Sequence, residues 1–143
     1  LRYEYVICQK GNEDRIALQT EHITEGPQKG IIANPTAAEE YATTVRVMKK
    51  LEALSRGGEV LPLTRNTWMF MGNYRNAAFS AWLTGVDSVT LDRLEMYYSL
   101  NPEKRPDAVW VGEKNAEYAE EFCTRFGYTG ETTPDGIFLT PDE

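Results

Sequence analysis

The stretch DAVWVG, Asp107 to Gly112, decides the fold class of this chain. Its four central residues are apolar and rich in β-formers, with no polar residue alternating between them, which is typical of a strand that is buried on both faces. A helical pattern that stops at Asn101-Pro102 precedes it, because the residue before a proline avoids the helical region. An amphipathic pattern from Asn115 to Phe126 follows it. We therefore expect a central strand covered on both faces.

Outward from this strand, helices alternate with strands. The longest helical pattern has apolar residues three or four positions apart, at Tyr41, Val45, Met48, Leu51 and Leu54. Two starts compete for this helix: a capping box of Thr36 with Glu39, or Asn34 as the cap with Pro35 at the first helical position. The sequence RGG that follows predicts a helix end at a left-handed glycine.

The remaining elements are shorter. Glu59 to Thr64 is predicted to be a strand, and Pro62 places it at an edge or a bulge. Asp87 or Ser88 is expected to cap a helix that carries Leu91, Leu94 and Tyr98. Pro-Asp-Gly in TTPDGIFLT is a turn signal ahead of a final strand.

At the start of the sequence, Leu1 to Gln9 alternates between apolar and polar residues, and Arg15 to Ile23 continues an extended pattern. The two runs are candidates for a hairpin, with the register open. The whole pattern predicts an α/β fold, a layered sheet with flanking helices and an N-terminal β-hairpin. The length of 143 residues fits a single domain over residues 1–143.

Charge and composition restrict the partners. Lys plus Arg number 15 and Asp plus Glu 22, which gives a net charge of −7. We expect no nucleic-acid binding, because that is driven by basic clusters. Cys8 and Cys123 are expected to be free thiols, and with His22 as the lone histidine no metal site or cofactor is predicted. The opening at Leu1 suggests a domain excised or processed from a longer chain.

Two stretches are candidates for ligand contact. The first is GPQKG, Gly26 to Gly30, in which Lys29 offers a positive charge. It lacks the full pattern of a phosphate-binding loop, so we expect a structural bend at Gly26 or Gly30. His22 is a possible general base, but no nucleophile motif accompanies it.

The second stretch is MGNYRNAAFSAW, Met71 to Trp82. Asn73, Tyr74 and Arg75 place an aromatic ring between two donor-rich side chains, and Trp82 follows. Aromatic faces with amide and guanidinium donors suit sugar rings or phosphates. A scaffold role, with the tryptophans in the core, is the alternative.

Four segments together resemble a known class of protein: EGPQKGI, AEEYATTVRVMKKL, MGNYRNAAFSAW and LEMYYSLNPEKRPDAVWV. They are similar to the soluble extracytoplasmic C-terminal domain of bacterial polytopic membrane proteins that look like glycosyltransferases of the dolichyl-phosphate-mannose mannosyltransferase type. The resemblance covers roughly Glu25 to Val111. It implies tethering to a membrane through upstream segments, on the extracytoplasmic face.

The resemblance also implies that no residue of this fragment is catalytic. The domain is then an accessory part that positions a glycan or a lipid-linked sugar. The alternative is a small free-standing transferase or hydrolase that uses the GPQKG loop and His22.

Overall fold

The computed structural model describes residues 19–64, 75–76 and 86–143. It divides into two compact units, residues 1–45 and 46–143, with the boundary inside one long helix. We describe each unit by itself. The α/β fold with a hairpin near its start is confirmed, although Leu1–Gln9, which we expected to form one strand of the hairpin, lies outside the described residues.

In the first unit, strand β1 (Glu21–His22) pairs antiparallel with β2 (Ile32–Ala33). The GPQKG stretch is the loop of this hairpin, and Gly26 and Gly30 have φ of 77° and 93°. Left-handed backbone of this kind favours glycine because a Cβ atom is strained there. The predicted bend is therefore confirmed at both glycines. It is closed by a hydrogen bond from the Gly30 N–H to the Ile23 carbonyl at 2.8 Å.

Helix α3 (Pro35–Ser55) follows the hairpin. The Asn34 Oδ1 atom accepts a hydrogen bond from the Ala37 N–H at 2.8 Å, so Asn34 is the cap and Pro35 is the first helical residue. The alternative prediction, that a capping box of Thr36 with Glu39 starts this helix, is wrong. The helix ends as predicted, with Gly57 left-handed at φ 78°.

The second unit contains a five-stranded sheet in the order β4-β3-β5-β7-β6. The strands are β3 (Glu59–Leu63), β4 (Arg75–Asn76), β5 (Ala108–Val111), β6 (Tyr128–Thr133) and β7 (Gly136–Pro141). Strand β3 is parallel to β4 and β5, whereas β7 is antiparallel to both β5 and β6. The central position predicted for β5 is confirmed, and Val109 and Val111 are fully buried.

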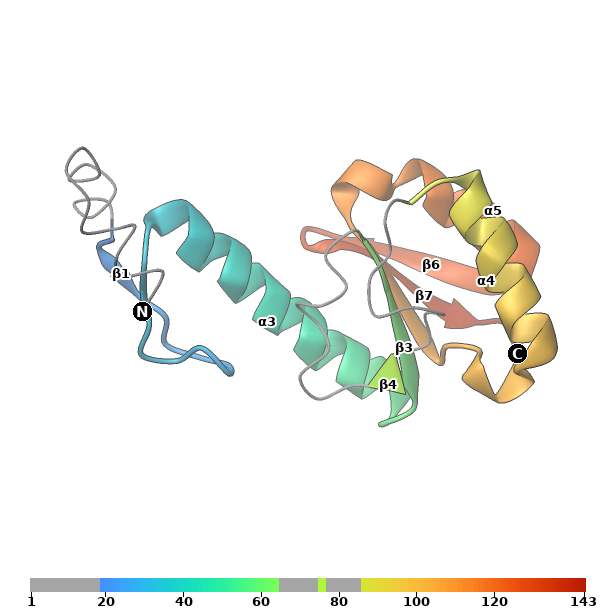
Figure 1. Cartoon of the computed structure of the whole chain (residues 1–143), viewed down its shortest axis with the longest axis horizontal. Coiled ribbons are helices and arrows are strands. Elements are labelled where there is room, and N and C mark those ends of the chain that lie inside the picture. Colours follow the sequence, from blue (N-terminus) through green and yellow to red (C-terminus); the bar gives the residue numbers. More distant parts are fainter. Residues whose placement is uncertain (1–18, 65–74, 77–85) are drawn as a thin grey trace. The chain divides into compact units, whose positions relative to one another are not determined.

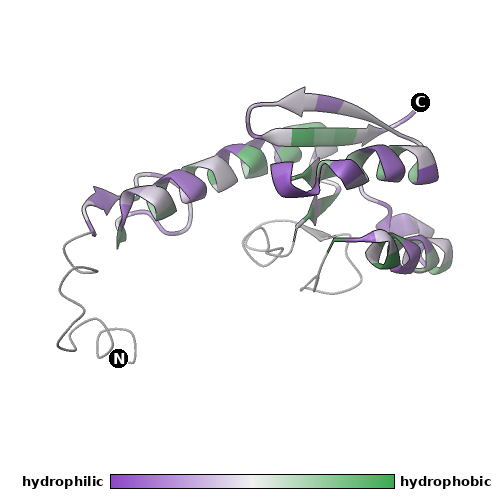
Figure 2. Cartoon of the chain, turned by 90° about the horizontal axis from the view of Figure 1, so that it is seen from above, coloured by the Kyte–Doolittle hydropathy of each residue, from purple (hydrophilic) through white to green (hydrophobic). Residues whose placement is uncertain are grey.

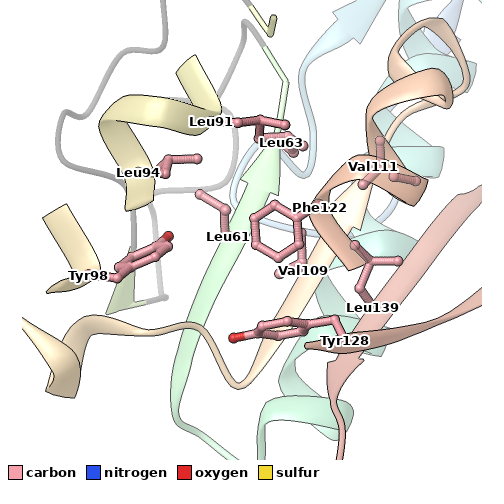
Figure 3. Packing of buried hydrophobic residues seen from close by; sticks show 11 residues of the cluster. Leu61, Leu63, Leu91, Leu94, Tyr98, Val109, Val111, Phe122, Tyr128 and Leu139 are labelled. Carbon is pink, nitrogen blue, oxygen red and sulfur yellow. The ribbon is translucent and has the colours of Figure 1, made fainter. Parts of the chain in front are cut away.

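Two helices cover one face of this sheet. Helices α4 (Ser88–Leu100) and α5 (Glu117–Phe126) supply Leu91, Leu94, Tyr98 and Phe122 to a cluster with strand residues such as Leu61 and Leu139. Figure 3 shows the Phe122 ring at the centre of this cluster. Asp87 caps α4 as predicted, and α5 ends at Gly127 with φ 73°.

The other face is covered by the second half of α3. Val47, Met48 and Leu51 pack against a cluster that contains Val60 and Phe138. The residues on the two faces of β3 therefore alternate between the two clusters, as the period of a strand requires. Figure 2 shows hydrophobic colour in part of the strands of this sheet, and both hydrophobic and hydrophilic colour along the helices.

Pro62 corrects one expectation. Strand β3 is not the outermost strand, because β4 lies beyond it in the sheet (Figure 1). Within the described residues, however, β4 pairs only with Glu59 and Val60. The Glu59 carbonyl accepts a hydrogen bond from the Asp107 N–H, so the backbone groups of Glu59 point towards β5. Because backbone groups point to alternate sides along a strand, the nitrogen of Pro62, three residues later, points away from β5. The missing N–H therefore costs no ladder bond with β5.

Candidate functional site

A hollow of about 600 Å³ lies in the second unit, next to the residues that precede β5 and β6. We call it the Arg105 basin. Its walls are Pro102, Glu103, Arg105, Pro106, Asp107, Phe126, Gly127, Tyr128, Pro141 and Asp142. The volume falls within the range of sites that bind small molecules. Three segments that are distant in the sequence meet here, at the end of α4, the end of α5 and the end of β7.

Arg105 is held in place by the end of helix α5. Its Nη2 atom donates a hydrogen bond to the Phe126 carbonyl, and its guanidinium carbon lies 5.7 Å from the centroid of the Tyr128 ring. The last carbonyls of a helix lack partners within the helix and carry its negative dipole end, so a guanidinium is a favourable cap. Arg105 is therefore fixed as a wall of the basin, although its side chain is exposed.

Tyr128 forms the buried floor of the basin. Its hydroxyl donates a hydrogen bond to the Pro106 carbonyl at 2.6 Å, which ties β6 to the segment before β5. Burial raises the pKa of Tyr128, Asp107 raises it further, and Arg105 opposes the shift. The phenol is therefore neutral at physiological pH and serves as a hydrogen-bonded support.

Two carboxylates are each fixed through one oxygen. Asp107 Oδ2 accepts from the Glu59 N–H at 2.9 Å, while the Asp107 N–H donates to the Glu59 carbonyl at 2.7 Å. Asp142 Oδ1 accepts from the Thr129 hydroxyl at 2.5 Å, and the Asp142 N–H donates to the Gly127 carbonyl at 2.9 Å. No described residue bonds to the second oxygen of either carboxylate. Each carboxylate thus has one oxygen held by the protein, by a backbone N–H for Asp107 and by a side-chain hydroxyl for Asp142, and a second oxygen that can accept a hydrogen bond from a ligand.

The charge of the basin determines which ligands suit it. Glu103, Asp107 and Asp142 oppose the single cation of Arg105, so the lining carries a net charge of −2 at neutral pH. Carboxylate oxygens accept strong hydrogen bonds from hydroxyl or ammonium groups and repel phosphates. Within the described residues no set of three His, Cys, Asp or Glu side chains is arranged to hold a metal ion. The arrangement therefore suits a hydroxyl-rich ligand that is neutral or cationic.

The residues predicted from the sequence lie elsewhere. Lys29 is exposed in the hairpin loop of the first unit, and His22 is exposed in β1. Arg75 belongs to β4, where its backbone pairs with Glu59 in the second unit. Asn73, Tyr74 and Trp82, together with Trp68 and Cys8, lie outside the described residues. The sugar or phosphate site proposed at residues 73–75 stays a prediction.

One local feature of the sequence does indicate the basin. The loop NPEKRPD contains three charged residues between its two prolines, and a fourth, Asp107, between the second proline and the buried strand β5. Charges held between prolines next to a rigid strand occupy restricted positions, because proline fixes its own backbone angle. The contribution of Asp142, 35 positions after Asp107, had no local signal.

The described helices include none that is both long enough and apolar enough to cross a bilayer. The comparisons with known proteins add no relative: no family model, no curated protein and no solved structure matches this chain.

Proposed function

We propose that the unit of residues 46–143 is a non-catalytic glycan-binding module, the accessory domain of a larger membrane protein, and that the Arg105 basin holds the saccharide. One observation carries this proposal. Asp107 and Asp142 are each pinned through one carboxylate oxygen and each keep the other oxygen as an acceptor. Acceptors that are held in position suit the hydroxyl groups of a sugar ring.

The proposal favours the saccharide over the phosphate of a lipid-linked sugar. Arg105 is the one cation in the lining, and it is already engaged by the Phe126 carbonyl. A phosphate in the basin would lie among three carboxylates, and like charges in a partly enclosed site repel one another. A lipid-linked sugar would therefore place its sugar here and its phosphate outside. Binding by such an open site is expected to be weak, about 4 kcal/mol for a millimolar dissociation constant.

Titration with three glucose derivatives of different charge tests the ligand class. Glucosamine is cationic, methyl glucoside is neutral and glucose 6-phosphate is anionic, and each is added to isotope-labelled protein at millimolar concentration. We expect amide shifts at residues 102–107, 126–128 and 141–142, with affinity falling from the cationic to the anionic sugar. Absence of shifts in these segments with all three sugars would contradict the proposal.

Paired variants separate binding from folding. Asp107→Asn keeps an acceptor for the Glu59 N–H but removes the charge, and Asp142→Asn does the same for the Thr129 hydroxyl. Both should weaken the binding of glucosamine about tenfold, since a hydrogen bond to a charged group contributes about 1.5–3 kcal/mol. Glu52→Gln on the exposed side of α3 removes the same charge far from the basin lining and should leave the affinity unchanged.

The membrane context rests on the resemblance of four segments to extracytoplasmic domains of polytopic membrane proteins. It is tested without an assay by reading the coding sequence on the 5′ side of the Leu1 codon. Several apolar spans of about 20 residues are expected there. A start codon immediately before Leu1 would instead favour the free-standing enzyme, in which Lys29 and His22 take part.

A further inference from the structure

Strand β6 forms an open edge of the sheet. It is the last strand in the order β4-β3-β5-β7-β6, and all six of its residues are in register with β7 without a bulge. Proteins usually protect such an edge with a lysine, a proline, a bulge or a covering segment. The sequence YTGETT of β6 contains neither lysine nor proline. Among the described residues, no strand pairs with its outer side.

The hydrogen-bond pattern identifies the groups that this edge presents. Gly127 and Asp142 form a hydrogen-bonded pair at the end of the ladder, with the Asp142 N–H donating to the Gly127 carbonyl at 2.9 Å. Antiparallel pairs alternate between bonded and non-bonded, so the backbone groups of Tyr128, Gly130 and Thr132 point away from β7. Tyr128 is buried, but Gly130 and Thr132 are exposed, so these two residues each offer one N–H and one C=O to a further strand.

The charge around this edge is negative. Glu131 lies within β6 with its side chain 66% exposed, although Lys50 binds it at 3.0 Å. Asp142 is bonded to Thr129 at the start of the strand, and the whole chain has a net charge of −7. A second copy of the chain would bring these carboxylates together and be repelled. A strand that carries lysine or arginine would be attracted.

We infer that β6 is a docking edge for an extended basic peptide segment of another protein, which adds a sixth strand to the sheet. In this mode of recognition the main-chain hydrogen bonds supply the affinity and the side chains supply the preference. The inference does not rest on the glycan proposal, because the main-chain groups of Gly130 and Thr132 form the edge and neither residue lines the basin.

The probe is an acetylated and amidated heptapeptide in which lysine alternates with threonine and valine, and its counterpart has glutamate in place of lysine. Both are added to the full chain, and amide hydrogen exchange is followed residue by residue. We expect the lysine peptide to slow exchange at the amides of Gly130 and Thr132, with weaker binding as salt is raised. The glutamate peptide should leave these amides unchanged at the same concentration.

Two variants of one position separate strand addition from plain charge attraction. Thr132→Pro removes an outward N–H that makes no bond to β7, so the fold is expected to persist and the affinity for the lysine peptide to fall about tenfold. Thr132→Val keeps the N–H and the branched shape, and its affinity should equal that of the parent. Circular dichroism confirms that both variants are folded.

Several results would overturn the inference. One is binding of the lysine peptide without any slowing of exchange at the amides of Gly130 and Thr132. Another is equal affinity of the Thr132→Pro and Thr132→Val variants. A third is slow exchange at these amides in the free protein together with a dimer in sedimentation, because the occupant would then be a second copy. Lack of any binding of the lysine peptide at millimolar concentration would also overturn it.

Discussion

Replacement of Gly136 by alanine is expected to destabilise the second unit far more than the same replacement at Gly57. Both glycines have positive φ, 122° at Gly136 and 78° at Gly57. A Cβ atom at Gly57 would meet no atom within 4 Å, whereas at Gly136 it would lie 2.5 Å from Trp110 Nε1 and 2.8 Å from the Val111 carbonyl oxygen. The stability loss of Gly57→Ala thus reports the backbone strain alone, whereas that of Gly136→Ala reports the strain and the steric overlap together.

The magnitudes follow from these contacts. At Gly57, strain of about 1–2 kcal/mol is partly offset by about 0.4–1 kcal/mol from the less flexible unfolded chain, which leaves about 1 kcal/mol. At Gly136 the new atom must displace the Trp110 ring, which donates a hydrogen bond to the Asp135 carbonyl at 2.9 Å. Overpacking adds about 1–3 kcal/mol and the lost hydrogen bond about 1 kcal/mol. The sum for Gly136→Ala is about 3–5 kcal/mol.

Urea unfolding followed by far-ultraviolet circular dichroism measures both variants against the parent chain. The midpoint should fall slightly for Gly57→Ala and strongly for Gly136→Ala, with unchanged slopes. Destabilisation of the two variants by equal amounts, within about 0.5 kcal/mol, would refute the reasoning. It would mean that the turn before β7 moves freely and that Trp110 does not anchor it.

Three further predictions concern other parts of the second unit. Phe122 is fully buried, so Phe122→Ala should cost about 3–5 kcal/mol in urea unfolding, whereas Met96→Ala, with the side chain 67% exposed, should change stability by less than about 0.5 kcal/mol. The N-cap hydrogen bond lowers the pKa of Asp87 in the folded chain; its stabilisation is therefore present at neutral pH and is lost as the pH falls below about 3.9. Asp87→Asn, which keeps the acceptor without the titration, should unfold with a weaker dependence on pH in acid, and an unchanged dependence would contradict this account. Burial raises the pKa of the Cys123 thiol and nearby carboxylates, including Glu120, raise it further, so iodoacetamide should react with Cys123 more slowly than with a free thiol, and Glu120→Gln should speed the reaction.

Local sequence signals predicted the ends of elements correctly where the conformation depends on only a few neighbouring residues. The Asp87 cap, the left-handed Gly57 and the turn before β7 are all decided within a few residues. The start of α3 was left open because two caps, Asn34 and Thr36, compete within two positions. Their intrinsic energies are similar. The structure selects Asn34, whose side chain bonds the Ala37 N–H.

The sequence by itself determined the α/β class and the buried central strand, because uninterrupted apolar runs and helical periodicity are properties of neighbouring residues. Only the tertiary structure decided the strand order, the position of Pro62 beyond the β4 ladder, and the Arg105 basin. The basin brings Asp107 together with Asp142, and β6 becomes an edge because β7 turns back beside β5. Such pairings form only when segments that are distant in the sequence pack together. The free energy that stabilises this packing comes from the whole core, so no short stretch of sequence determines it.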